Sequence, residues 1–247
     1  MPVRIALGRR VFAPSWTFTL LTILLLWAFI ELGRWQWGKG QLRQAEWDQF
    51  ERGTDQILDL PATQGLKDIP RFQRIRLTGR LDADHQFLLD NRTYEGHAGY
   101  EVLTALDRGG GELTLIDRGW VPFTGQRSRL PSVAFATTGP RTLVGRAAGL
   151  PAAGLASGRA PPLHDASWPK VTTYPTIEQL SGALGRRLEP QIVLLDPKEP
   201  DGYVRDWHPP GPEPIRHWSY AVQWWSFAVM LVALWFGMNL HKVPEAT

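Results

Sequence analysis

The chain has 247 residues, a formal net charge of +3, no cysteine and a slightly negative mean hydropathy of −0.22. The lack of cysteine excludes disulfides, zinc–thiolate sites and thiolate copper chemistry. The basic residues Arg4, Arg9, Arg10 and Lys242 lie near the termini, so the middle of the chain is close to neutral. We therefore see no basic patch of the kind that binds nucleic acid, and we expect no nucleic-acid partner.

Two uncharged apolar runs flank this polar middle, one from Val11 to Ile30 and one from Trp218 to Leu240. A transmembrane helix needs roughly 20 such residues to cross a hydrocarbon core of about 30 Å. A cleaved signal peptide is the alternative for the first run, but no A-x-A-type site follows it and it exceeds an h-region of about 7–15 residues. A buried core helix is the alternative for the second run, but such a helix would carry a polar stripe.

Basic residues at the outer ends of both runs predict that the two tails face the cytoplasm. We therefore predict a multi-pass protein of the bacterial inner membrane whose middle is periplasmic. The predicted division is a tail over 1–10, a transmembrane helix over 11–32, a periplasmic domain over 33–216, a transmembrane helix over 217–240 and a tail over 241–247. The alternative of a mitochondrial location is less well supported than a bacterial one, because the short N-terminus leaves little room for a transit peptide.

The middle is predicted to be rich in β-strands. It begins with a helical stalk over 33–53, which Gly38 and Gly40 weaken. Period-two alternation then predicts strands over 71–81, 86–91, 100–106, 112–120, 141–148 and 190–196. A short helix is expected over 176–184 with Thr176 as its cap, and Trp120 is expected to be buried. Together these elements predict an α+β membrane protein, with two transmembrane helices flanking an antiparallel β-barrel-like domain.

Two further segments are predicted to be irregular. Residues 149–162 form an Ala/Gly/Pro-rich surface loop of unknown role, and residues 197–214 form a proline-rich, semi-rigid connector to the second apolar run.

Four short motifs occur in the order that is typical of one family. They are residues 32–36 (LGRWQ), Arg92 followed by residues 96–100 (GHAGY), residues 116–122 (IDRGWVP) and residues 217–224 (HWSYAVQW). With the two apolar runs, they resemble the surfeit locus protein 1 family of cytochrome c oxidase assembly factors over nearly the whole chain. Three residues depart from the family pattern: Asp117 stands for the usual Asn, Trp218 for the usual Leu, and Arg216 for a small or polar residue.

The resemblance implies a role in assembling a haem-copper terminal oxidase. It implies transient binding of haem a and help with its insertion into the catalytic subunit. The implied partners are that subunit, the haem a synthesis machinery and the lipid bilayer. The residue that matches the family's proposed iron ligand is His217.

His217 is therefore the candidate metal ligand, since neutral imidazole binds haem iron well. On a helix, Tyr220 and Trp224 follow it on one face and could line a porphyrin. The alternative is an interfacial histidine that caps the helix, with aromatic residues that only pack. Close approach of the spans at Gly33 would add Trp35 and Gln36 to the lining, although both could be simple interface anchors.

Arg92 and Arg118 are the candidate partners of haem propionates, because a guanidinium can donate two hydrogen bonds to a carboxylate. The alternative for both arginines is structural, with internal salt bridges to Asp90 or Asp117 across the sheet.

An enzyme is not expected, since the sequence contains no G-x-S-x-G motif, no H-E-x-x-H motif and no cysteine. The competing hypothesis is a membrane scaffold that holds oxidase subunits and never binds haem. A haem spectrum that copurifies with the protein would separate the two.

The predicted topology can be tested with a reporter that is active only in the periplasm. Fused after Thr247 it should be silent, and inserted at Gly154 it should be active. The reverse pattern would contradict the orientation that the basic tails predict.

Overall fold

The computed structural model describes residues 5–7, 10–52, 56–135, 139–151, 160–162, 167–209 and 211–242. The chain divides into two compact units, which we describe separately. We call residues 1–47 with 211–247 the helical unit and residues 48–210 the β unit. Most of the 149–162 loop predicted above lies outside the described residues.

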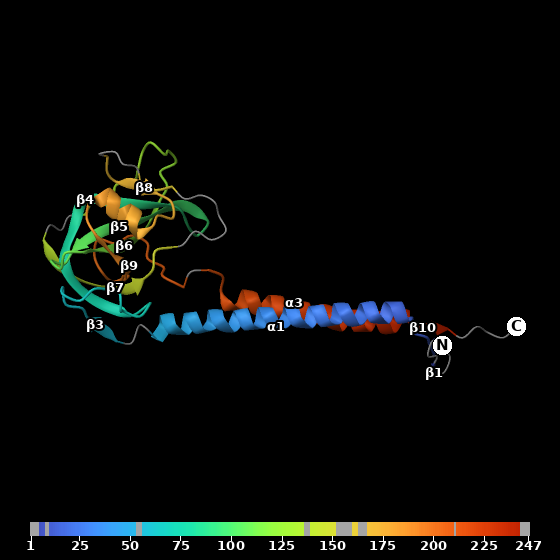
Figure 1. The fold of residues 1–247 in the computed structure, drawn as a ribbon. Coiled ribbons are helices and arrows are strands. Elements are labelled where there is room, and N and C mark those ends of the chain that lie inside the picture. Colours follow the sequence, from blue (N-terminus) through green and yellow to red (C-terminus); the bar gives the residue numbers. More distant parts are fainter. Residues whose placement is uncertain are drawn as a thin grey trace. The chain divides into compact units, whose positions relative to one another are not determined.

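The helical unit contains two long helices, α1 (Trp16–Arg52) and α3 (Pro214–Met238), which lie side by side in Figure 1. Both are long and apolar enough to cross a membrane. Large apolar side chains lie exposed on their outer surfaces, among them Leu20, Leu24, Trp27, Val229, Met230 and Leu234. Such a surface would be unfavourable in water and is suited to a lipid environment.

The first helix differs from the prediction at both ends. It begins at Trp16 rather than at Val11, because Arg10–Phe12 form the strand β2. It also continues without a break through the predicted stalk, so the helical stalk is confirmed and the two glycines do not interrupt it.

A small sheet, which the sequence did not reveal, joins the two ends of the helical unit. Its order is β1 (Ile5–Leu7), β2 and β10 (Leu240–Lys242), and both pairings are antiparallel. Three-residue strands are too short to show the alternation from which strands are predicted.

The two long helices interlock through glycine and tryptophan. A Cβ added at Gly33 would overlap the Trp225 indole, and one added at Gly40 would overlap the Trp218 indole. The Trp37 ring lies between them, with its centroid 5.9 Å from that of Trp218 and 5.8 Å from that of Trp225.

The buried residues of α3, which are Pro214, Ala221 and Ala228, recur every seven positions. This repeat is the pattern of coiled-coil packing, in which large side chains enter holes on the facing helix.

The β unit contains a seven-stranded mixed sheet in the order β3-β4-β5-β6-β9-β7, with β8 paired to β4. Its strands are β3 (Ile57–Asp59), β4 (Arg74–Tyr94), β5 (His97–Asp107), β6 (Leu113–Pro122), β7 (Pro140–Ala148), β8 (Lys170–Thr172) and β9 (Leu188–Leu195). Since β7 pairs with both β9 and β4, the hydrogen-bonded path returns to β4. Buried Ile75, Leu77 and Leu81 confirm the predicted inward face of β4.

The expectation of an antiparallel domain is confirmed only in part: β4–β5, β4–β7, β5–β6 and β7–β9 are antiparallel, but β3–β4, β4–β8 and β6–β9 are parallel. Parallel neighbours need a long crossover connection, and the chain between β6 and β9 provides one that includes α2 (Ile177–Leu184). The predicted cap of α2 is confirmed: the hydroxyl of Thr176 accepts from the N–H of Gln179, whose side chain accepts in return from the N–H of Thr176.

Two smaller predictions also need correction. The predicted strands over 71–81 and 86–91 are one strand, β4, whose register against β5 shifts between Leu81 and Gln86.

Trp120 is only partly buried, whereas the next residue, Val121, is buried. The Trp120 indole Nε1–H donates to the carbonyl of Arg92 at 3.4 Å, and a Cβ at Gly99 would overlap its ring. Trp120 therefore packs across the surface of the sheet rather than into the core.

The Gly–Trp interlock predicts opposite effects for two glycines of α1. Gly33→Ala should weaken the pairing of α1 with α3 by about 1–3 kcal/mol, the usual cost of overpacking. Gly38→Ala should instead stabilise the helix by about 1 kcal/mol, since nothing lies within 4 Å of the added Cβ. Thermal unfolding of both variants in detergent measures the difference, and equal stability would contradict the interlock.

Candidate functional site

The central feature of the candidate site is a hydrogen bond between α1 and α3. Nδ1 of His217 lies 2.9 Å from Oε1 of Gln36, and the imidazole is half-buried. With the amide oxygen as acceptor, Nδ1 carries a proton, and the neutral tautomer that fits this bond has its lone pair on Nε2. Within the described parts of the chain, Nε2 makes no hydrogen bond. The pair therefore turns Nε2 away from the hydrogen bond, and in the neutral ring this nitrogen could bind a metal.

The His217–Gln36 pair lies at the polar end of the apolar surface. His217 directly precedes the charge-free stretch of α3 that starts at Trp218, and Gln36 lies between Arg34 and Lys39 on α1. A ligand held there would have apolar helix surface on one side and polar residues on the other.

Aromatic rings continue from His217 along the same side of the helix pair. Helical spacing places Tyr220 and Trp224 on the face of His217. Trp224 stacks on Phe29 of α1 with a centroid distance of 5.8 Å and an interplanar angle of 28°. It also meets Phe227 edge-on at 5.8 Å. Tyr220 is 47 % exposed and so leaves apolar ring surface open beside the imidazole.

Trp35 does not join this group. It is 57 % exposed, and the contact of its ring is with the ammonium of Lys39, 6.0 Å from the centroid. Successive helix residues point about 100° apart, so Trp35 turns away from the seam that Gln36 faces.

Both candidate arginines belong to the β unit. Arg118 on β6 is almost fully buried, and its guanidinium donates to Oε1 of Gln86 at 2.8 Å and to the carbonyls of Val133 and Asp201 at 3.0 and 2.8 Å. Burial lowers the pKa of Arg118. These contacts make Arg118 a structural centre of the β unit.

Arg92 on β4 is paired with an acid of the neighbouring strand. Its Nε lies 3.0 Å from Oε2 of Glu101, and its guanidinium lies 5.2 Å from the Tyr174 ring centroid. The partners expected for the two arginines were therefore wrong: Asp90 pairs with Arg127, and Asp117 accepts from the N–H of Gly119 at 3.0 Å.

Two acids, the buried Asp117 and the partly buried Glu101, lie on neighbouring strands where two of the sequence motifs meet. In the register of β5, Gly99 pairs with Arg92 and Pro122, and Glu101 pairs with Trp120. Burial raises the pKa of Glu101, although Arg92 partly offsets the effect. Burial, and then the charge of Glu101, raise the pKa of Asp117 well above its ordinary value.

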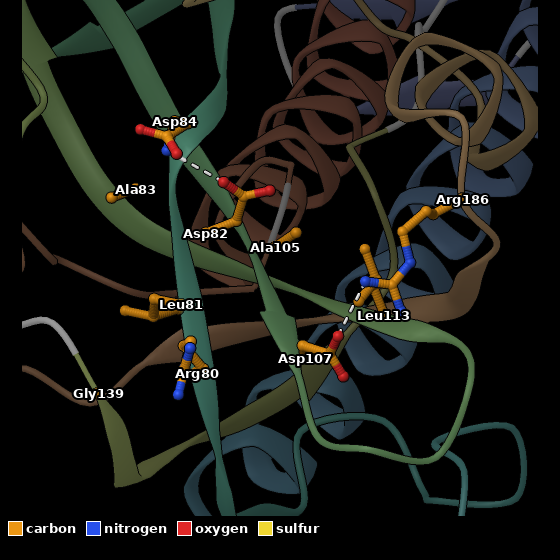
Figure 2. Close-up of a pocket in the computed structure, with 10 residues that line it drawn as sticks. All are labelled: Arg80, Leu81, Asp82, Ala83, Asp84, Ala105, Asp107, Leu113, Gly139 and Arg186. Carbon is orange, nitrogen blue, oxygen red and sulfur yellow. Dashed lines mark hydrogen bonds and ion pairs between the residues drawn. The ribbon is translucent and has the colours of Figure 1, made fainter.

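The β unit also contains a hollow of about 460 Å³, shown in Figure 2, which none of the predicted site residues lines. Asp82 and Asp84 lie on its β4 side, and Arg186 pairs with Asp107 at 2.8 Å. The hydrogen bond from Arg186 is the main cause of the lowered pKa of Asp107.

In the described ranges, no three His, Asp or Glu side chains gather in a way that could hold a metal ion.

Several residues that contact the predicted site residues were not predicted from the sequence. Phe29 lies seven residues before Gln36, and Trp225 lies seven after Trp218, so a search for seven-residue spacing would have found both. Glu101 carries no comparable signal, because its role depends on the cross-strand neighbours that the fold supplies.

Comparison with known families gives one match. The model of the SURF1 family matches residues 23–229, a range that includes both His217 and Gln36 and all of the β unit. No curated protein matches the chain.

The buried carboxyl of Asp117 predicts a pH-dependent stability. Because its pKa is raised in the folded state, its favourable contribution is complete below the unfolded value of about 3.9 and is lost as the pH rises toward the folded value. Asp117→Asn keeps an acceptor for Gly119 and should be more stable than the parent at pH 7, with a gain that disappears near pH 4.

Urea unfolding between pH 4 and pH 8 tests this expectation, and Asp107→Asn is the control. The pKa of Asp107 is lowered, so its contribution is present above the unfolded value and is lost in acid. The control should therefore lose stability at pH 7. If the two substitutions changed the stability in the same way between pH 4 and pH 8, the raised pKa of the buried Asp117 would be contradicted.

Proposed function

The chain belongs to the SURF1 family, which is associated with cytochrome c oxidase assembly, and we propose that it receives haem a at His217 and helps to insert it into the catalytic subunit of a haem-copper oxidase. The family consists of assembly factors and is not a known enzyme class. The proposed partners are the catalytic subunit, the machinery that synthesises haem a, and the lipid bilayer. The proposed setting is the bacterial inner membrane, with α1 and α3 as spans and the β unit in the periplasm.

The observation that carries the proposal is the hydrogen bond from Nδ1 of His217 to Oε1 of Gln36. Histidine ligands of metals usually donate their second ring N–H to an acceptor, which fixes the tautomer and the ring orientation. When bound, haem iron takes a lone pair from such a ring nitrogen. In the neutral ring, the bond to Gln36 favours the tautomer with its lone pair on Nε2, so the residues present fit the group.

The surroundings of His217 support a flat, largely apolar ligand. Tyr220 and Trp224 offer ring faces on the same side of α3, and Trp224 is held by its stack on Phe29. The position of His217 at the polar end of the apolar surface would let carboxylates stay near water. We therefore assign Gln36 the role of orienting the imidazole, and Tyr220 and Trp224 the role of lining the site.

Three predicted residues are given other roles. Arg92 and Arg118 use their guanidinium groups within the β unit, so we propose that they stabilise this unit rather than bind propionates. Trp35 is proposed to be an interface anchor, since aromatic residues with a polar edge favour the membrane surface.

The proposal predicts separate results for three single substitutions, measured on protein purified from cells that make haem a. His217→Ala should fold and insert normally but lose the haem spectrum or show it altered, with reduced oxidase maturation. Gln36→Leu should keep the ligand but weaken haem retention about 10–100-fold, as loss of an orienting partner does at metal sites. His97→Ala, an exposed histidine of the β unit, is the control and should change neither.

An unchanged haem a spectrum at full occupancy in His217→Ala would exclude ligation by this residue. If the parent protein itself never carried haem, the scaffold hypothesis would replace the haem chaperone.

A further inference from the structure

A hollow of about 310 Å³ in the β unit shares no lining residue with the one in Figure 2. We call it the Tyr100 hollow. Its polar lining includes Tyr100 on β5, Lys170 on β8, and Arg127, which follows β6. Its apolar lining consists of Leu130, Pro169 and Val171. The volume is enough for a small organic molecule, which would meet both polar and apolar side chains there.

Tyr100 brings a buried hydroxyl to this hollow. The residue is 1 % exposed, and its ring packs against that of Phe123 with the centroids 6.2 Å apart. Within the part of the chain that the structure describes, the Tyr100 hydroxyl makes no hydrogen bond. Hydroxyl groups inside a protein are nearly always hydrogen-bonded. A ligand oxygen in the hollow would supply an acceptor for this one.

The charges of Asp90 and Arg127 both act on the Tyr100 hydroxyl. Burial, and then the charge of Asp90, raise the pKa of Tyr100, whereas the charge of Arg127 lowers it. The hydroxyl therefore lies within electrostatic reach of the Arg127 guanidinium, which lines the same hollow. Because the net effect is a raised pKa, the group stays protonated at neutral pH and can donate a hydrogen bond.

The lining of the Tyr100 hollow carries positive charge. Among the described residues it contains Arg127 and Lys170 but no aspartate or glutamate. Lys170 is buried, and its Nζ lies 4.9 Å from the centroid of the Trp168 ring. Arg127 donates one N–H to Oδ2 of Asp90 at 2.5 Å, and its side chain is 74 % exposed. A guanidinium has five N–H donors, so Arg127 can serve a second carboxylate as well.

We propose that the Tyr100 hollow binds the carboxylate of a small organic acid. The hydroxyl of Tyr100 and the guanidinium of Arg127 donate to the carboxylate oxygens, and Leu130 and Val171 pack against the apolar part of the acid. An inorganic anion would lose water beside these apolar side chains without gaining a partner there, which favours an organic acid. The site is independent of the proposed haem function, because no residue assigned to haem lines it.

The test is a titration of the full chain in neutral detergent with benzoate, followed by ligand-observed nuclear magnetic resonance. Benzamide has nearly the same shape without the charge and should bind about tenfold more weakly, since hydrogen bonds to a charged acceptor are stronger. Inorganic phosphate has no apolar part and should also bind more weakly than benzoate. Absence of benzoate binding would overturn the site. Benzamide binding as tight as that of benzoate would overturn the carboxylate, and phosphate binding as tight would overturn the organic acid.

Single substitutions test the two donors. Tyr100→Phe keeps the ring and should weaken benzoate binding about tenfold, the effect of one lost hydrogen bond to a charged group. Its thermal unfolding should match that of the parent, because no hydrogen bond within the described chain is lost. Arg127→Gln should weaken binding by a similar factor. Arg129→Gln, at an exposed position outside the lining, is the matched control and should bind benzoate like the parent.

Asp90→Asn should have the opposite effect. It removes the negative charge that acts on the Tyr100 hydroxyl, so benzoate should bind more tightly than to the parent. Unchanged binding by Tyr100→Phe or by Arg127→Gln would overturn the assigned donors, and weaker binding by Asp90→Asn would overturn the charge argument. His217→Ala should bind benzoate like the parent, so failure of the haem proposal and failure of this one give different results.

Discussion

The register in which α1 meets α3 depends on two tryptophans that occupy the spaces left by two glycines. In lipid there is no hydrophobic gain from bringing two apolar helices together, so shape and hydrogen bonds must determine how they pair. Trp218 and Trp225 fit against Gly40 and Gly33, and a shift by one turn would remove both fits at once. This register brings His217 opposite Gln36. The chemistry proposed for the imidazole is therefore a consequence of packing elsewhere on the same helices.

The β unit solves a different problem, because it must bury charged side chains without leaving them unpaired. Arg108 and Glu189 form a buried ion pair at 3.1 Å, and Glu189 also accepts from Thr114 and from the N–H of Leu66. Each of these groups would be costly if its partners were removed. Together with Arg118, they link β5, β6 and β9 to the loop that contains Leu66.

The predictability of each part follows from the range of the interactions that form it. Ile75 and Leu77 alternate within one strand, and Thr176 caps the helix next to it, so local sequence was sufficient for both. The alternation within β9 predicted a strand, but its parallel pairing with β6 and the small sheet of β1, β2 and β10 depend on distant contacts that leave no local pattern. His217 was predicted from its motif and Gln36 from its place one turn after Gly33, and the structure shows a hydrogen bond between the two. The pairing of Arg92 with Glu101 required the cross-strand register, which no motif states.

The small sheet also bears on the order in which the protein can be made. The amide of Ser15 bonds to the side chain of Asn239, 224 positions further along the chain, and β2 pairs with β10. Neither contact can form until the ribosome has completed α3, so before that point β2 can pair with β1 but not with β10. Contacts this distant in sequence close late, since the loop between them must be ordered first. The contacts that join β2 and Ser15 to the end of α3 are thus expected to form late in the folding of the helical unit.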